Sequence, residues 1–220
     1  MTVLLTGYDP FGEYEVNPTE ALAERLDGRT VAGQEVEGVV LPVVFDRTYG
    51  EFIEHFERHS PDAVISLGLA GGRNAVSVER VGINVNDTES TPDNADEAPH
   101  NEPILDGPDA YFATIPVVGI VEDLIEAGIP ARVSNSAGTH LCNNILYATR
   151  HYVETNDLDV PSGFIHVPLS AEQAADRAAD TAVHAESVEP SLPLSMQERA
   201  VETAIETTVE ALRKTPSSTA

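Results

Sequence analysis

The sequence has little positive charge, a single cysteine and no long apolar run. Lysine and arginine number 12 among 220 residues, against 37 aspartates and glutamates, so the formal net charge is −25. This charge disfavours nucleic acids and anionic membranes as partners. One cysteine cannot form an intrachain disulfide, and no segment approaches the roughly 20 apolar residues of a membrane span. The first residues also lack the basic start of a secretion signal, so we expect a cytoplasmic protein.

Only one of the basic residues, Lys214, is a lysine. The acidic residues are spread along the chain, as in the helix-like series Glu198, Glu202, Glu206 and Glu210. This pattern resembles halophilic proteins, in which salt of about 1 M shortens the Debye length to roughly 3 Å and screens surface repulsion. An acidic protein of a mesophile is the alternative interpretation.

Apolar runs bounded by turn residues alternate with segments of helical period along the chain. The runs predict strands at residues 3–6, 36–44, 63–67, 76–85, 114–118, 131–134 and 164–167. The segments predict helices at residues 19–26, 46–59, 117–127, 141–154 and 195–214. We therefore expect an α/β fold: a single three-layer α/β/α domain over residues 1–214, with a largely parallel, mixed, twisted sheet. Residues 215–220 are expected to form a disordered tail.

Two loop features bear on function. In such sheets the binding crevice lies beyond the carboxyl ends of the strands, so the turns at 6–12, 67–73 and 134–142 should converge. Residues 87–109 are too irregular for a helix or strand and longer than most loops, which predicts a lid.

The last helix should begin with a capping box formed by Ser195 and Glu198.

Three residues could form a catalytic set. Cys142 stands where a strand-like run breaks and a helical pattern begins, and a helix start should lower the pKa of its thiol from about 8.5. His166 and Glu79 each lie within another strand-like run. Thiol, imidazole and carboxylate together indicate covalent catalysis, if the fold brings them together.

Each of these residues also has a plain structural interpretation. Free cysteines are among the most buried residues, so Cys142 could be a packing residue. His166 could be a hydrogen-bonded core histidine, and Glu79 could form a salt bridge with the adjacent Arg80.

Two further patterns carry weaker signals. His55 and His59 are four residues apart, but no third ligand is evident, so we expect them to be exposed and predict no metal site. The glycine-rich segment 68–73 could cradle a phosphate, yet it matches neither nucleotide-binding fingerprint. We interpret it as a tight turn beside the site.

A series of motifs covers residues 3–170 in order: TGYDPFG at 6–12, NP at 17–18, LPVVF at 41–45, GLAGGR at 68–73, ERVGIN at 79–84, PDN at 92–94, SNSAGTHLCN at 134–143 and GFIHVP at 163–168. This series resembles the pyroglutamyl peptidase type I family, also called pyrrolidone-carboxylate peptidase. The resemblance is weaker after residue 170, where only the terminal helix matches.

The resemblance implies a cysteine peptidase that removes an N-terminal pyroglutamyl (5-oxoprolyl) residue from peptides through a thioester acyl-enzyme. It also implies a homotetramer without a cofactor. The family's catalytic residues fall on Glu79, Cys142 and His166. The substrate-binding positions fall on a second set: Tyr8, Phe11, Asn17, Leu69, His140 and Leu141.

Some of these positions depart from the family pattern. Tyr8 replaces phenylalanine, Leu69 replaces glutamine, and His140-Leu141 replaces an aromatic residue followed by valine. The segment 87–94 is one residue longer than usual and lacks an arginine associated with the oxyanion. Two alternatives therefore stay open: a catalytically weak or inactive pyroglutamyl-peptide-binding relative, and a nucleotide- or nucleoside-binding α/β enzyme that uses residues 68–73.

Overall fold

A seven-stranded sheet forms the centre of the molecule, in the strand order β2-β3-β1-β4-β9-β5-β8. The computed structural model describes residues 1–88, 91–180 and 188–214, and the predicted tail lies outside them. The strands of this sheet are β1 (Thr2–Tyr8), β2 (Thr30–Val31), β3 (Gln34–Leu41), β4 (Ala63–Leu69), β5 (Val76–Glu79), β8 (Ala131–Ser134) and β9 (Ser162–Val167).

The middle of the sheet is parallel. β1 pairs in parallel with β3 and β4, and β4 pairs in parallel with β9. β2 runs antiparallel to β3, and β5 antiparallel to β9, so the sheet is mixed. β4 and β9 are buried along their whole length. Both faces of these strands are covered, which explains why their sequences are nearly continuous apolar runs.

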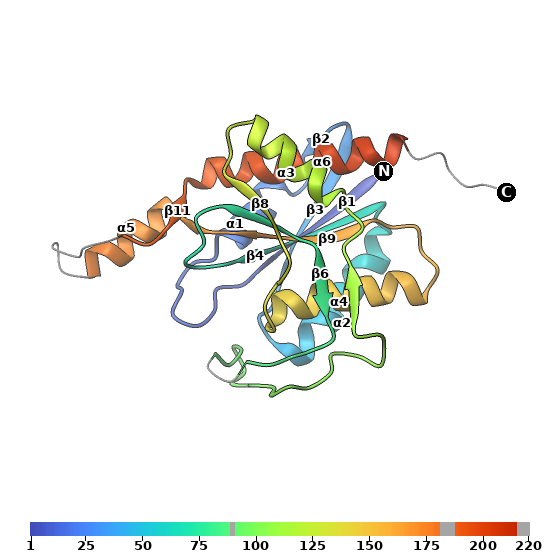
Figure 1. Ribbon diagram of the computed structural model, residues 1–220, viewed down its shortest axis with the longest axis horizontal. Helices are drawn as coiled ribbons and strands as arrows, with labels where there is room; N and C mark the ends of the chain where they lie inside the picture. Colours follow the sequence, from blue (N-terminus) through green and yellow to red (C-terminus); the bar gives the residue numbers. More distant parts are fainter. Residues whose placement is uncertain (89–90, 181–187, 215–220) are drawn as a thin grey trace.

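Helices cover both faces of the sheet (Figure 1). α1 (Pro18–Leu26), α3 (Val117–Glu126) and α6 (Leu194–Lys214) lie on one face, and α2 (Phe45–His59) and α4 (Leu141–Thr155) lie on the other. Each face has its own apolar core. The predicted three-layer α/β/α architecture with a largely parallel, mixed sheet is confirmed.

The start of α1 shows how local sequence fixes an element near the site. Asn17 is the N-cap: its Oδ1 accepts the backbone N–H of Thr19 at 3.1 Å, and Pro18 occupies the first helical position. The Nδ2 group of Asn17 donates to the carbonyl of Asp9 at 2.9 Å. The cap therefore ties α1 to the turn that follows β1.

Two strand predictions are wrong. The run at 76–85 divides into β5 and β6 (Val81–Ile83), and β6 pairs with β7 (Ala110–Phe112) in a separate two-stranded sheet. Residues 114–118 form no strand, because Pro116 is the N-cap of α3 and the apolar residues after it enter the helix. A short apolar run does not by itself distinguish a strand from a helix start.

The C-terminal part also differs from expectation. α6 begins at Leu194, so the predicted capping box is wrong: Ser195 lies inside the helix, and Glu198 pairs instead with Arg25 at 3.3 Å and Arg29 at 2.8 Å. The pattern missed β10 (Leu169–Ser170), α5 (Ala171–Asp180) and β11 (Ser191–Leu192). α5 contains no large apolar residue, so its sequence lacks the strong apolar stripe by which helices are predicted.

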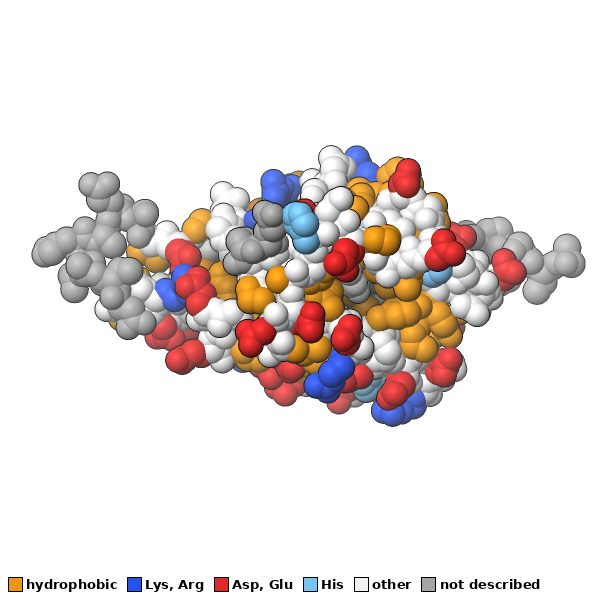
Figure 2. Space-filling view, turned by 90° about the horizontal axis from the view of Figure 1, so that it is seen from below, with side chains coloured by type: hydrophobic (Ala, Val, Ile, Leu, Met, Phe, Trp, Pro, Cys, Tyr) orange, Lys and Arg blue, Asp and Glu red, His pale blue; other side chains and the backbone are white. Residues whose placement is uncertain are grey.

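The surface carries the charge that the composition predicts. Figure 2 shows acidic side chains scattered over the face seen from below, with apolar patches between them. Within the described part of the chain, no helix combines the length and the apolar character that crossing a bilayer requires.

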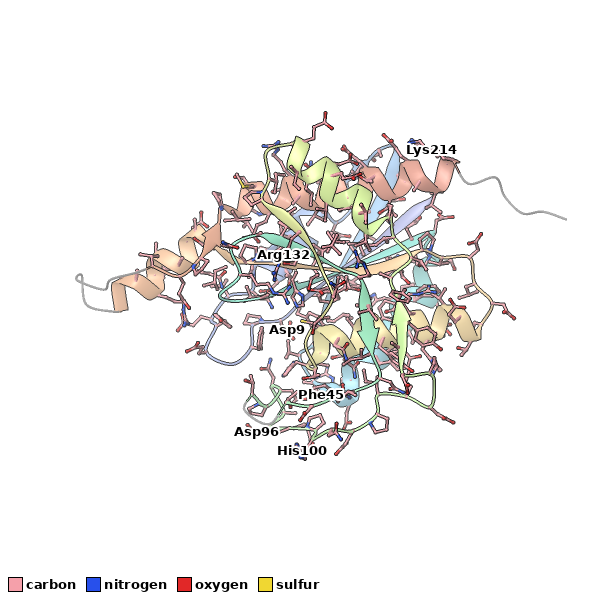
Figure 3. The ribbon with its side chains drawn as sticks, viewed as in Figure 1. Asp9, Phe45, Asp96, His100, Arg132 and Lys214 are labelled. Atoms are coloured by element: carbon pink, nitrogen blue, oxygen red, sulfur yellow. The ribbon has the colours of Figure 1, made fainter. Side chains whose placement is uncertain are left out.

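The segment 87–109 forms neither a helix nor a strand in its described part. An isolated bridge between Asn86 and Glu102 closes its base. In Figure 3 the segment lies at the lower edge of the molecule, where Asp96 and His100 are labelled. Movement of this segment as a lid stays a prediction.

Candidate active site

Cys142 is the second residue of α4, and its thiol points toward the sheet. A methyl group added to Gly68 of β4 would lie 2.7 Å from Sγ of Cys142 and 2.6 Å from the ring of Phe164. The sulfur therefore rests against the bare backbone of Gly68, and a larger residue there would displace it. The helix start occupies its position because β8 ends at Ser134 and the loop 135–140 leads into α4.

His166 and Glu79 form a buried pair on two adjacent strands. Nδ1 of His166 lies 2.7 Å from Oε1 of Glu79, and the two residues are 4% and 0% exposed. β9 places the histidine beside β5, at whose end the glutamate lies. An ionised carboxylate only accepts hydrogen bonds, so Nδ1 of His166 carries the proton and Nε2 is left as an acceptor.

Sheet register brings the thiol and the imidazole to the same face. Gly68 pairs with His166 in the parallel ladder of β4 and β9, and residues paired in this way project to one side of the sheet. Phe164, two residues before His166, packs edge-on against the imidazole with ring centroids 4.9 Å apart. Sγ of Cys142, the imidazole and the Glu79 carboxylate thus gather at one corner of the sheet.

The protonation states follow from burial and from the contacts within the set. Burial acts to raise the pKa of Glu79, but its contacts with His166, Ser134 and Arg73 outweigh burial and lower the pKa. Burial lowers the pKa of His166, and the hydrogen bond and charge of Glu79 oppose this only in part. At rest the pair is therefore an ionised carboxylate with a neutral imidazole.

The thiol corrects one prediction. Burial, together with the charge of Glu79, raises the pKa of Cys142 to about 12, although Arg73 and the backbone act to lower it. We expected the helix start to lower this pKa. Removing the thiolate from water raises the pKa by more than the helix start lowers it. The resting side chain of Cys142 is therefore a neutral thiol.

A small pocket opens beside the thiol. All six residues predicted for substrate binding line it: Tyr8, Phe11, Asn17, Leu69, His140 and Leu141. Cys142 and Val43 complete the lining, and Val43 was not among the predicted site residues. Tyr8 is held there by donating its hydroxyl to the carbonyl of Leu141 at 3.1 Å. The turns after β1 and β4 and the start of α4 therefore meet at this pocket, as expected for a sheet of this type.

Phe11 and His140, which line the pocket, belong to an aromatic cluster that extends to Phe45 behind it. The ring of His140 lies between Phe11 and Phe45, with centroid separations of 6.2 Å and 5.2 Å. Nε2 of His140 lies 3.1 Å from the carbonyl of Thr91 and must donate to it. Phe45, labelled in Figure 3, is the first residue of α2 and was not predicted as a site residue.

Asp93 organises the segment behind this cluster and was also missed. Its buried carboxylate accepts three backbone N–H groups, from Phe45 at 2.8 Å, Ala95 at 2.8 Å and Glu97 at 2.9 Å. The neighbouring Asn94 donates to the carbonyl of Pro10 at 2.9 Å. The motif at residues 92–94 was the available signal, because it belongs to the series that carries the family resemblance.

The glycine-rich turn 68–73 does not form an open phosphate cradle. Gly68 is closed by Cys142 and Phe164, and the guanidinium of Arg73 bonds Oε1 of Glu79 at 2.7 Å. The alternative interpretation of Glu79, a salt bridge with Arg80, is wrong, since Arg80 donates to Oδ1 of Asn135 at 2.9 Å. The geometry gives the nucleotide-binding alternative no support.

The two histidines of α2 lie apart from this site. His55 and His59 stack with ring centroids 6.1 Å apart, and Nδ1 of His59 lies 3.2 Å from a carboxylate oxygen of Glu37. Both are partly buried rather than exposed as predicted, because the helix places them beside its apolar stripe. Among the described residues, no group of three or more side chains is arranged to hold a metal ion.

A thiol at a helix start, a histidine–carboxylate pair and an adjoining pocket define the class of cysteine-dependent hydrolases. Comparison with known proteins specifies the family. The profile of the pyroglutamyl peptidase family matches residues 1–211, and the chain belongs to this family of cysteine peptidases.

Individual relatives agree with this assignment. The pyrrolidone-carboxylate peptidase of Coprothermobacter proteolyticus is 47% identical over 174 residues, which cover 79% of this chain and 84% of that protein. The Pyrococcus furiosus protein of the same name is 45% identical over 177 residues, covering 80% and 85%. A crystal structure of pyrrolidone carboxyl peptidase from Pyrococcus furiosus superimposes with a TM-score of 0.91 at 42% identity, covering 96% of this chain and 100% of that one.

Proposed function

We propose that this protein is a cysteine exopeptidase that removes an N-terminal pyroglutamyl residue from peptides. The observation that carries the proposal is the pocket beside Cys142, at the corner where the His166–Glu79 pair is buried. Membership of the pyroglutamyl peptidase family supports the choice of substrate.

The resting protonation states define the first chemical step. Because the pKa of Cys142 is raised to about 12 and the pKa of His166 is lowered, the thiol and the imidazole are both neutral. As Sγ attacks the carbonyl carbon that joins pyroglutamate to the next residue, the thiol proton passes to Nε2 of His166. Glu79 then stabilises the imidazolium through the Nδ1–H bond.

The remaining steps use the same groups. The carbon–nitrogen bond of the tetrahedral intermediate breaks, the leaving amine takes the proton from Nε2, and a thioester to Cys142 remains. Water, activated by the neutral imidazole, hydrolyses the thioester and releases free pyroglutamate. The first backbone N–H groups of α4 have no partner within the helix and can stabilise the oxyanion.

The residues that line the pocket have the chemistry that suits an uncharged ring. Its lining combines Phe11, Val43 and Leu69 with the polar groups of Tyr8 and Asn17. A pyroglutamyl ring is a neutral lactam, whereas every unblocked peptide begins with a charged amine that would have to lose its hydration in this pocket. We therefore expect strong preference for pyroglutamyl over prolyl and glutaminyl peptides.

The direct test is release of a fluorescent amine from pyroglutamyl-aminomethylcoumarin in molar KCl. Wild type should release the amine, and Cys142→Ala should abolish release; cleavage that survives this substitution would disprove the proposal. Absence of release from folded wild type would favour the pyroglutamyl-peptide-binding relative, and the first suspect would be segment 87–94, which lacks the family's arginine.

Assembly and environment are part of the same proposal. A homotetramer in a salt-rich cytoplasm accords with the net charge of −25, because molar salt would screen repulsion between subunits. The stripe of α2 is poorly suited to an interface, since Phe52 and Phe56 are buried in the core, whereas Val118 and Ile125 of α3 are 52% and 58% exposed. Light scattering in about 0.2 M and about 3 M KCl, which differ strongly in charge screening, tests this. A monomer at both salt concentrations would exclude the tetramer.

A further inference from the structure

Arg73 reaches the catalytic corner from the turn after β4. Gly72 has a φ of +80°, which turns the chain, and the backbone N–H of Arg73 donates to the carbonyl of Ala70 at 3.3 Å. From there the guanidinium donates to Oε1 of Glu79 at 2.7 Å and to the carbonyl of Ser136 at 3.3 Å. Arg73 thereby joins three segments: the turn after β4, the end of β5 and the loop that precedes α4.

Glu79 needs a cationic partner because of its burial. It is 0% exposed, and the same Oε1 atom accepts both the Arg73 guanidinium and Nδ1 of His166, each at 2.7 Å. Since His166 is neutral at rest, Arg73 supplies the full positive charge at this carboxylate. A buried carboxylate without such a partner becomes protonated. A protonated Glu79 would no longer fix the tautomer of His166.

We propose that Arg73 is a positioning residue of this active site, which keeps Glu79 ionised so that Nδ1 of His166 donates to it and Nε2 stays free for the thiol proton. This inference rests on the proposed function. Arg73 also acts to lower the pKa values of Cys142 and His166, through its charge. Its loss should therefore raise the pKa values of Glu79, His166 and Cys142 together.

Arg80 provides a matched control. It is the residue after Glu79, and it bonds Asn135 at 2.9 Å, in the same loop that Arg73 contacts through Ser136. Its side chain makes no hydrogen bond to Glu79 in the described structure. Arg80→Gln therefore removes one arginine and one loop contact and leaves the catalytic pair intact.

The first experiment compares turnover as a function of pH. In Arg73→Gln, kcat should fall by about 10²-fold, the typical cost of a misplaced catalytic group. KM should stay within about twofold, and the acid limb of the kcat/KM profile should move to higher pH by about one unit or more. Arg73→Lys keeps the charge, so its acid limb should stay near that of wild type. Wild-type kcat and an unmoved profile in Arg73→Gln would overturn the inference.

The second experiment does not depend on turnover. Cys142 is the only cysteine, so the rate of alkylation by iodoacetamide reports on its thiolate alone. At any pH below the thiol pKa, alkylation should be slower in Arg73→Gln than in wild type, and Arg80→Gln should react at the wild-type rate. If wild type releases no amine from pyroglutamyl-aminomethylcoumarin, the proposed function fails, while this alkylation profile still decides the role of Arg73.

A double substitution separates positioning from a general structural role. In the Glu79→Gln background there is no carboxylate to keep ionised, so adding Arg73→Gln should change kcat by less than about twofold. A further large loss would show that Arg73 acts elsewhere and would refute the inference. If Arg73→Gln alone does not fold, Arg73→Met, which keeps an unbranched stem but removes the charge, replaces it in both pH experiments with the same expected and overturning outcomes.

Discussion

The two faces of the central sheet carry different kinds of core. On the face covered by α1, α3 and α6, the buried apolar residues of the described structure are all aliphatic, for example Leu22, Ile120 and Ile205. The face covered by α2 and α4 contains the rings of Tyr8 and Phe164, and Cys142 packs among them.

The difference shows how the fold separates stability from chemistry. Burying Glu79 and His166 is costly unless each polar group has a partner. The two side chains are partners of each other, and Arg73 reaches Glu79 from the turn after β4, at the proposed active site. The helices on the aliphatic face also bury polar groups, such as Gln197 of α6, whose Nε2 donates to three backbone carbonyls. Among the described residues these helices bury no charged side chain, so their contribution is mainly packing. Substitutions on the two faces should therefore affect different measurements.

The largest effect is expected for Glu79→Gln on the catalytic face. The amide can donate as well as accept, so His166 would lose its fixed tautomer, and kcat should fall by about 10⁴-fold, as for triads that lose their carboxylate. Steady-state release from pyroglutamyl-aminomethylcoumarin measures this. The control is Glu198→Gln on α6, whose partly exposed pairs with Arg25 and Arg29 should leave kcat unchanged. A loss below about tenfold in Glu79→Gln would contradict the assigned role.

The next effect is expected on the aliphatic face. Ile205 is 0% exposed on α6, so Ile205→Ala should lower the free energy of unfolding by about 2–5 kcal/mol through lost burial and a cavity. Urea unfolding in molar KCl measures this change, and kcat per folded molecule should stay at the wild-type value. If kcat fell while stability did not, the proposed division between the faces would be wrong.

A substitution at the boundary of the site should give an intermediate effect. In Gly68→Ala the new methyl group would lie 2.7 Å from Sγ of Cys142, so the thiol must move, and kcat should fall by about 10²-fold. The matched control is Gly50→Ala in α2, where an added methyl group meets nothing within 4 Å. That change should leave kcat unaltered and stabilise the helix by about 0.5–1 kcal/mol. Equal kcat in the two variants would place the thiol elsewhere.

The sequence predicted the parts of the fold that depend on local pattern. The positions of β1, β4 and β9 and the extent of α2 and α4 follow from apolar runs and from helical period. The run at 76–85 misled because β5 and β6 belong to different sheets, and only long-range pairing with β9 and β7 separates them. Local pattern contains no information on such pairing.

The site divides in the same way. Cys142, His166 and Glu79 were recognisable from residue type and motif, and the structure brings them to one corner. The partner of Glu79 was not recognisable: the adjacent Arg80 turns to Asn135, and the more distant Arg73 reaches the carboxylate. The pKa of the Cys142 thiol depends on how deeply the fold buries it, and the sequence alone does not show this burial. The direction of its pKa shift was therefore predicted wrongly.

The smallest effect concerns pH and His140, at the wall of the pocket. Burial lowers the pKa of His140, against the opposing influence of the Thr91 carbonyl and of Asp93. Below the ordinary histidine pKa of about 6.5, the unfolded chain binds a proton here that the folded ring resists. The free energy of unfolding should therefore fall as the pH drops through this range.

His140→Phe should flatten that decrease, because phenylalanine cannot be protonated. The aromatic contacts with Phe11 and Phe45 can persist in the variant, while the bond to Thr91 is lost at every pH. Urea unfolding of both proteins at pH values of about 8, 6.5 and 5, which bracket the ordinary histidine pKa, measures the difference between their free energies of unfolding. Since all other titrating groups are shared, a difference that stays constant with pH would show that His140 does not contribute to the pH dependence of this face.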